Sequence, residues 1–260
     1  MHGPSVVGRA DLGYPRAGRT ETSMDVARMF RTFPIFQGLA DDQLAVLLPL
    51  ARARAFGRGE VIFREGDPPA HLWLVVRGLV KIVRRAGDRD LILEILGPTD
   101  TFGEVAVYDG IPYPATAVSA ESSTVLSIPR DGFFAALERH PDLARGLLRE
   151  LTRHLRIVTR RLDELTKAGI DRRMALLLVR LAERAGRPHA AGTLIPVALS
   201  RQDLAELTGT TIETAIRIMS RWSKQGLVRT EKGGFVIPDL AALAAVGEGA
   251  ARGRPADDSP

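Results

Sequence analysis

The sequence predicts an α+β protein in which a strand-rich N-terminal domain is followed by one long helix and a mostly helical C-terminal domain. Three observations predict this order. Short β-branched runs alternate with Gly, Pro and Asp from residue 56 to about 130. An apolar pattern with heptad spacing follows residue 141, and two short helical patterns separated by a glycine follow residue 200. The apolar period is about 2 residues in strands and about 3.6 in helices, so the change of period separates the domains.

Length and composition narrow the classes of protein to consider. The 260 residues are enough for two modest domains. No run approaches the roughly 20 apolar residues of a membrane span, so no membrane partner is expected. The absence of cysteine excludes disulfides and cysteine-ligated iron–sulfur clusters. It also suits the cytoplasm, where we expect the protein to act.

The two ends of the sequence have a different character. Residues 1–24 contain no apolar core of the kind found in a secretory signal, and the tail over 247–260 is mostly Gly, Ala, Arg, Pro and Asp. We expect both segments to be disordered. Either Met1 or Met24 is the true start.

The strand-rich domain is expected over 25–138. It opens with helical stretches, the second of which has Asp41 as a candidate N-cap. Short strands then recur with a turn every 8–12 residues or so, which predicts a β-sandwich or a barrel. The strand candidates are "EVIFREGDPP", "HLWLVVRGLVKIVRR", "DLILEILGPTDTFGE" and "TAVSAESSTVLSIPR".

The long helix is expected over 139–168. Pro141 suits its first turn, where the missing N–H would have no intrahelical partner anyway. Apolar residues then recur at alternating spacings of four and three, at Ala144, Leu148, Leu151, Leu155, Val158, Leu162 and Leu165. A stripe this narrow is typical of a coiled-coil seam and predicts a homodimer. The alternative is a helix that packs against its own domain.

The C-terminal domain is expected over 169–246. A helix from Asp171 to near Gly186 is followed by a loop, "RPHAAGT". Ser200 then caps a second helix, with Asp203 three residues later in the position of a capping box. Gly209 turns the chain and a threonine at 210 or 211 caps a third helix, which is the helix-turn-helix pattern. "VRTEKGGFVIP" fits a β-hairpin that forms a wing.

The third helix carries candidate DNA-reading residues. Glu213 and Arg217 are four residues apart and share one face, with Thr214 beside them. A carboxylate accepts a hydrogen bond from cytosine N4, and a guanidinium donates two to guanine O6 and N7. The alternative is an ordinary ion pair on a surface helix. Charge favours duplex DNA as the partner, because 167–246 holds 12 Lys and Arg against 7 Asp and Glu. Four further residues are candidate phosphate contacts: Arg201, Gln202, Thr211 and Lys224.

Four segments together resemble the Crp–Fnr family of bacterial transcription regulators. They are "VIFREGDPPAHLWLVVRGLVKI", "FGEVAVYDG", the seam helix and "LSRQDLAELTGTTIETAIRIMSRWSKQGLV". The resemblance covers roughly 25–246. It implies a jelly-roll-like β-roll sensor domain, a dimerisation helix and a winged helix-turn-helix. It also implies a homodimer on a near-palindromic operator, and RNA polymerase as a partner if the protein activates transcription.

The resemblance assigns roles to single residues of the third helix. Glu213 and Arg217 match the base-reading pair of the family, which implies a G·C pair in each half-site, and Arg201 and Gln202 match contacts to the DNA backbone. Members that bind cyclic AMP carry an Arg where Ile212 stands here. An apolar residue at position 212 is more similar to the Fnr branch, although Ile216 stands where that branch often has Ser.

The resemblance also implies an effector pocket around "FGEVAVYDGIPYPATA". Its residues would be Gly103, Glu104, Val105, Tyr113, Ala115, Thr116, Val158 and Thr159. In cyclic-nucleotide-binding members an Arg-Ser pair grips the phosphate, and Tyr113 and Pro114 stand at those positions. A cyclic phosphate needs a positive charge or several N–H donors to offset its desolvation, and Pro114 removes one donor. We therefore expect an effector other than cyclic AMP.

Other interpretations stay open at this point. The pocket takes a less charged small molecule, it is vestigial, or the domain binds haem through a histidine such as His71 or His154. No metal site is predicted. A rival class is an effector-binding regulatory module of another assembly, which would have no use for Glu213 and Arg217. An enzyme is not expected, because the sequence has no phosphate-binding Gly-rich loop, no HExxH motif and no cysteine nucleophile.

Overall fold

The computed structural model describes residues 28–86 and 89–248, without the side chains of 86, 89–90 and 160–167. The expectations for 1–24 and for 249–260 fall outside the described residues. The chain forms two compact units that divide between Thr159 and Arg160. No helix in the described part combines the length and apolar character needed to cross a bilayer.

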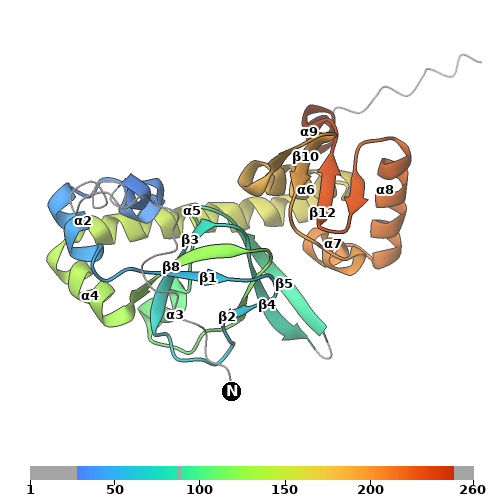
Figure 1. Cartoon of the computed structure of the whole chain (residues 1–260). Helices are drawn as coiled ribbons and strands as arrows, with labels where there is room; N and C mark the ends of the chain where they lie inside the picture. Colours follow the sequence, from blue (N-terminus) through green and yellow to red (C-terminus); the bar gives the residue numbers. More distant parts are fainter. Residues whose placement is uncertain (1–27, 87–88, 249–260) are drawn as a thin grey trace, which may run out of the picture. The chain divides into compact units, whose positions relative to one another are not determined.

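The first unit contains two antiparallel four-stranded sheets (Figure 1). One sheet has the order β1-β8-β3-β6, with β1 Arg52–Phe56, β8 Ser123–Pro129, β3 His71–Arg77 and β6 Thr101–Phe102. The other has the order β2-β7-β4-β5, with β2 Val61–Phe63, β7 Thr116–Ser119, β4 Val80–Ala86 and β5 Arg89–Leu96. The two antiparallel sheets agree with the predicted β-roll.

A mainly aromatic and aliphatic core joins strands from both sheets. Its buried residues are Phe56, Phe63, Trp73, Val75, Val80, Leu96, Phe102, Ala106, Tyr113, Ala117 and Val125. A second buried cluster lies under the helices, where Phe30, Phe33 and Phe36 pack against residues of β3, β8 and the helices that follow. Together the two clusters bury the alternate apolar residues that defined the strands in the sequence.

Short helices accompany these sheets, among them η1 Pro34–Phe36, α2 Asp41–Leu47, α3 Glu104–Asp109 and α4 Arg130–Arg139. Asp41 was expected to cap α2 but is its first residue; Ala40 is the N-cap, and its N–H donates to Gln43 Oε1 at 2.8 Å. The shift is one residue, within the usual uncertainty of a helix end.

The long helix α5 runs over Pro141–Lys167, with Pro141 at its start as predicted. One face is buried against the first unit through Leu143, Leu147 and Glu150. Gly146 makes this approach possible, because a Cβ there would lie 2.0 Å from the Ile35 carbonyl oxygen. The helix therefore packs against its own domain on one face, while the predicted seam lies on another.

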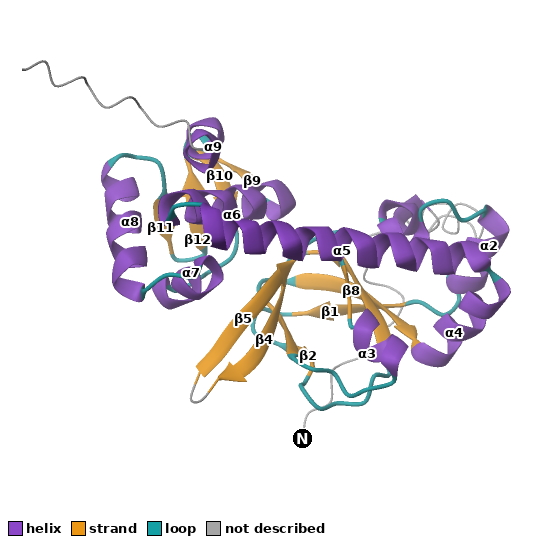
Figure 2. Ribbon diagram, turned by 180° about the vertical axis from the view of Figure 1, so that it is seen from behind, coloured by secondary structure: helices purple, strands orange, loops and turns teal. Residues whose placement is uncertain are grey.

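The second unit contains α6 Ile170–Ala185, α7 Arg201–Thr208, α8 Ile212–Lys224 and α9 Leu240–Glu248 beside one antiparallel sheet (Figure 2). The sheet has the order β11-β12-β10-β9, with β9 Arg187–His189, β10 Gly192–Ile195, β11 Arg229–Glu231 and β12 Gly234–Ile237. The predicted helix-turn-helix and wing are both present.

Two expectations for the second unit were wrong. Residues 187–193 were expected to form a loop, but they contribute β9 and the first half of β10, and β10 pairs with β12 of the wing. Helix α9 was not predicted, and it extends to Glu248, two residues into the tail expected to be disordered. Gly247 is buried, and a Cβ there would lie 3.0 Å from Leu176 Cδ2, so α9 ends packed closely against α6.

Candidate nucleic-acid interface and effector site

The helix-turn-helix is fixed by local hydrogen bonds at each end of its turn. The Asp203 N–H donates to Ser200 Oγ at 3.0 Å, and the Ser200 N–H donates to Asp203 Oδ2 at 2.7 Å, which completes the predicted capping box of α7. Gly209 has φ 62° and ψ 51°, the left-handed conformation that glycine adopts at little cost. The Thr214 N–H donates to Thr211 Oγ1 at 3.3 Å and caps α8.

Arg173 of α6 holds the same turn from outside, a role that the sequence did not indicate. Its Nε donates to the Thr208 carbonyl at 2.7 Å, and its Nη2 donates to the Gly209 carbonyl at 3.0 Å. A third bond joins Nη1 to the Ala168 carbonyl at 2.7 Å. These carbonyl groups lie at helix ends, where no intrahelical partner is left for them, and a cation there is favourable.

Helix α8 presents the predicted base-reading residues on its exposed face. Ala215, Ile218, Met219 and Trp222 are buried, whereas Glu213 and Arg217 are exposed. Both belong to the described part of the chain, and no ion pair joins them there, which disfavours a purely structural surface pair. The N–H of Glu213 itself and the Thr211 hydroxyl lower the pKa of Glu213, so its carboxylate stays ionised.

The predicted phosphate contacts lie on α7 and at the two ends of α8. Arg201 Nη2 donates to Thr230 Oγ1 at 2.8 Å, and partial burial lowers the pKa of Arg201. Gln202 Nε2 donates to Glu206 Oε1 at 2.7 Å. Lys224 is exposed at the last turn of α8, and the Thr211 hydroxyl bonds to Thr214 Oγ1. The candidate interface thus combines two kinds of side chain. Cationic side chains are exposed on α8, whereas Arg201, Gln202 and Thr211 already form hydrogen bonds within the second unit.

The predicted effector residues Gly103 and Glu104 begin α3. Gly103 has φ 81°, a conformation that favours glycine, and a Cβ there would make a tight contact of 3.0 Å with Tyr113 Cε1. Glu104 is 9% exposed. Burial raises the pKa of Glu104 to about 6, and its Oε2 is buried without a hydrogen-bond partner. A buried carboxylate oxygen of this kind is ready to accept a bond from a ligand hydroxyl or amine.

Helix α5 brings more ionisable groups to Glu104. His154 Nδ1 lies 3.6 Å from Glu104 Oε1, and His154 Nε2 lies 3.7 Å from Glu94 Oε2 of β5. The Glu94 carboxylate raises the pKa of His154, against the effect of burial. Glu150, which is fully buried, also raises the pKa of Glu104 through its charge. Three carboxyl groups therefore face one imidazole.

A buried ion-pair network supports Glu150. Arg153 donates to both Glu150 oxygens, from Nη2 at 2.6 Å and from Nε at 3.0 Å. The same Nη2 donates to Asp100 Oδ1 at 3.3 Å. The network ties α5 to the turn between β5 and β6. The sequence did not indicate it, because Arg153 and Asp100 are 53 residues apart and Arg153 resembled the other exposed arginines of the helix.

Tyr113 lies inside the aromatic core of the first unit. Packing in this core explains the residue better than the predicted role in lining an effector pocket. Its ring stacks on Phe63 with centroids 3.8 Å apart. Its hydroxyl donates to the His71 carbonyl at 2.6 Å and accepts from Trp73 Nε1 at 3.2 Å. His71 is the first residue of β3. The hydroxyl is thus engaged within the fold.

The remaining predicted pocket residues differ in how exposed their side chains are. Ala115 is buried, Thr116 is half-buried on β7, and Thr116 Oγ1 accepts from the Glu65 N–H at 3.0 Å. Val105 is exposed on α3, and Val158 and Thr159 are exposed on α5. The Thr159 hydroxyl donates to the Leu155 carbonyl at 2.9 Å. Of the predicted residues, Gly103, Glu104 and Tyr113 are therefore the group that the structure brings together.

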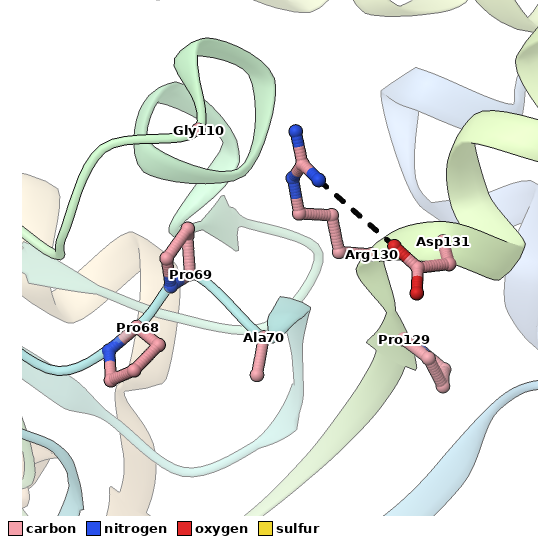
Figure 3. A pocket seen from close by; sticks show the side chains of 7 residues that line it. All are labelled: Pro68, Pro69, Ala70, Gly110, Pro129, Arg130 and Asp131. Carbon is pink, nitrogen blue, oxygen red and sulfur yellow. Dashed lines mark ion pairs between the residues drawn. The ribbon is translucent and has the colours of Figure 1, made fainter.

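A surface pocket of about 410 Å³ lies elsewhere in the same unit (Figure 3). Its lining comprises Pro68, Pro69, Ala70, Gly110, Pro129, Arg130 and Asp131, which include none of the predicted effector residues. Arg130 Nε donates to the Val107 carbonyl at 2.9 Å, and the guanidinium lies over the Phe134 ring. Because Arg130 is already engaged in this way, we assign no effector role to the pocket.

Comparison with known proteins decides the family. A model for the cyclic nucleotide-binding domain matches residues 53–140, and a model for the Crp-like helix-turn-helix domain matches residues 172–246. A CRP-like cAMP-activated global transcriptional regulator of Mycobacterium tuberculosis is 32% identical over 211 residues, which cover 81% of this chain and 94% of that protein. The chain belongs to the Crp–Fnr family of transcriptional regulators.

Further relatives agree with this membership. A cyclic AMP receptor protein of Thermus thermophilus is 31% identical, with 84% of this chain and 98% of that protein covered. The crystal structure of a CRP-family transcriptional regulator, also from Thermus thermophilus, matches with a TM-score of 0.64 at 25% identity, covering 75% of this chain and 96% of that one. This member of the Crp–Fnr family is a DNA-binding transcriptional regulator with an effector-binding domain and not an enzyme, as the sequence predicted.

Proposed function

We propose that this regulator binds a near-palindromic operator as a homodimer, with α8 of each copy in successive major grooves. The observation that carries the proposal is the exposed Glu213–Arg217 face on a helix whose start is fixed by Gly209, Thr211 and Arg173. The N-terminal residues of the second helix in this motif meet base edges. Glu213 and Arg217 then contact one G·C pair in each half-site, with Thr214 beside them.

The sequence stripe on α5 supports the homodimer. Leu148 and Leu155 are 64% and 66% exposed, and Leu151 and Val158 are also exposed. Leu162 and Leu165 continue the stripe in the sequence, but their side chains lie outside the described ones. An apolar stripe of this length on a helix is covered by a second helix in a coiled coil. Pairing of two copies would present two α8 helices to half-sites about 34 Å apart.

We further propose that the effector is neutral or cationic rather than cyclic AMP. Glu94 and Glu104 lie beside His154, and these carboxyl groups can accept hydrogen bonds from a hydroxyl or an ammonium group of a ligand. Tyr113 and Pro114 replace the pair that would grip a phosphate. Arg84 contacts the Pro114 carbonyl through a 3.4 Å bond from its Nε, and its side chain is exposed. The relatives named for cyclic AMP do not settle the effector of this chain.

DNA reading is tested by selection from random duplexes followed by fluorescence anisotropy. The full-length chain should select an inverted repeat with a G·C pair in each half, and its affinity should fall steeply as salt rises. Arg217→Ala should lose about 1–3 kcal/mol of discrimination at that pair. An unchanged base preference in Arg217→Ala would show that the base-reading face is wrongly assigned.

The effector is tested by native mass spectrometry of the purified dimer and by calorimetric titration with cyclic AMP. A co-purified neutral or cationic small molecule, lost in Glu104→Ala, would support the proposal. Saturable micromolar binding of cyclic AMP that disappears in Arg84→Ala would contradict it.

A further inference from the structure

Two large apolar side chains lie exposed on α8, one helical turn apart. Ile212 is 36% exposed and Ile216 is 46% exposed. Among the described residues from 168 to 248, these are the two large apolar side chains that stay exposed, while Ile218, Met219 and Trp222 of the same helix are buried. One exposed isoleucine would need no explanation, but an adjacent pair on one helix indicates a surface that another molecule covers.

The pair lies directly beside the base-reading residues. Ile216 immediately precedes Arg217 and follows Glu213 by three positions. With 3.6 residues per turn, the line of Ile212 and Ile216 lies about 100° around the helix from the line of Glu213 and Arg217, and Ile216 is a neighbour of Glu213 at the i,i+3 spacing. A helix that brings Glu213 and Arg217 to base edges therefore brings Ile216, and at its N-terminal end Ile212, to the neighbouring bases.

We propose that Ile212 and Ile216 contact the C5-methyl groups of thymines next to the G·C pair, and so set the base preference of this regulator beyond that pair. The inference rests on the proposed function of α8. In the major groove the thymine methyl is the apolar group that a base presents, whereas guanine, adenine and cytosine present donors and acceptors there. An isoleucine placed against the polar edge of such a base would desolvate its donors and acceptors without bonding to them. Guanine, adenine and cytosine are therefore disfavoured at these positions.

Geometry and conformational freedom suit this role. Four residues of helix rise about 6 Å, which corresponds to roughly two base-pair steps of about 3.4 Å. The two side chains therefore reach thymines at different positions of one half-site. Isoleucine is branched at Cβ and has few rotamers in a helix, so its methyl groups are held in place before the DNA arrives.

Charge favours DNA over an apolar protein surface as the occupant. The same exposed face carries Arg217 and Lys224, and α8 presents its N-terminus, with its positive dipole, beside Ile212. An apolar protein partner would have to desolvate these cations without compensation. DNA supplies phosphates for them and methyl groups for the isoleucines.

The test replaces single thymines by uracils, which removes one methyl group and no hydrogen bond. The operator is one selected by the full-length wild-type chain from random duplexes. At thymines within about two steps of the G·C pair, each exchange should weaken binding about fourfold. The double variant Ile212→Ala/Ile216→Ala should bind the thymine and uracil duplexes equally, and each single variant should lose the difference at one thymine position. Val46→Ala, at an exposed aliphatic residue of α2, is the matched control and should keep the fourfold difference.

The outcomes separate this inference from the proposed function. If the wild-type chain selects no sequence, base reading by α8 itself fails. If selection requires Arg217 but every uracil exchange changes the Kd by less than about twofold, thymine reading is wrong. It is equally wrong if the isoleucine variants keep the thymine preference, or if they lose self-association while their DNA preference is unchanged. Exposed isoleucines tolerate alanine in a helix, so the variants should fold.

Discussion

Arg173 shows how one side chain can fix a motif from outside it. Its guanidinium donates to the carbonyl oxygens of Ala168, Thr208 and Gly209. We expect Arg173→Ala to lower the free energy of unfolding of the second unit by about 2 kcal/mol, because the carbonyl groups lose charged donors. Chemical denaturation followed by Trp222 fluorescence measures this. Arg172→Ala, at the exposed neighbouring arginine, is the control, and equal stabilities of the two variants would show that Arg173 does not hold the turn.

Glu104 and His154 make the stability of the first unit depend on pH. Burial raises the pKa of Glu104 to about 6 from 4.5, and the Glu94 carboxylate raises the pKa of His154. In both cases the folded state binds a proton more tightly than the unfolded state, so stability is present at low pH and is lost as pH rises through the folded pKa. The Glu104 contribution is about 2 kcal/mol, lost between about pH 4.5 and 7.

Glu104→Gln should remove most of that loss. Glutamine keeps the shape but does not ionise, so the variant should gain stability relative to wild type as pH rises from about 4.5 to 7. The Glu104 charge also raises the pKa of His154, so the variant also loses part of the pH-dependent His154 contribution, which acts in the same direction. Thermal melts at several pH values provide the measurement, with the exposed Glu65→Gln as control. A stability difference that does not vary with pH would contradict the buried, protonated state of Glu104.

At this scale the sequence predicted local contacts well and distant ones poorly. Ser200, Gly209 and Thr211 have the predicted roles, because a cap bonds to a residue three positions away. Tyr113 was expected in the pocket, yet its partners Phe63 and Trp73 lie far from it in the sequence, Trp73 by 40 residues. No pattern in the sequence reports a contact over that separation.

Helix α7 depends on its capping box. Ser200→Ala removes the acceptor for the Asp203 N–H, and we expect the second unit to lose about 1 kcal/mol of stability. Ser223→Ala, at an exposed position near the end of α8, should change stability little. Urea denaturation compares the two variants. If Ser200→Ala is no less stable than Ser223→Ala, the box does not contribute to the motif.

Whole elements were predictable where the period of apolar residues was sustained. The helices α5, α6, α7 and α8 and the wing were predicted, because each shows a clear period or turn chemistry. The hairpin of β9 and β10 was missed because β9 is three residues long, contains Pro188 and lies at the sheet edge. Its partner β12 is far along the chain, so the pairing is a tertiary effect.

At the scale of the whole molecule, α5 contributes to two surfaces: one face is buried against the first unit, and another carries an exposed apolar stripe. Leu143, Leu147 and Glu150 are buried against the first unit, while Leu148, Leu151, Leu155 and Val158 remain exposed. The heptad pattern left these two surfaces as alternatives, and the structure shows apolar residues on both faces. We propose that a second copy covers the exposed stripe, and a base-reading helix on each copy would then require a repeated site.

The mass of the complex between the full-length chain and its selected operator tests this most directly. In sedimentation equilibrium at micromolar protein, two chains should bind each duplex, and the free protein should already be a dimer. Leu155→Glu, which places a charge in the stripe, should yield single chains with much weaker binding, whereas Val46→Glu on α2 should not. One wild-type chain per duplex, or a selected site without an inverted repeat, would contradict the homodimer and with it the paired reading of DNA.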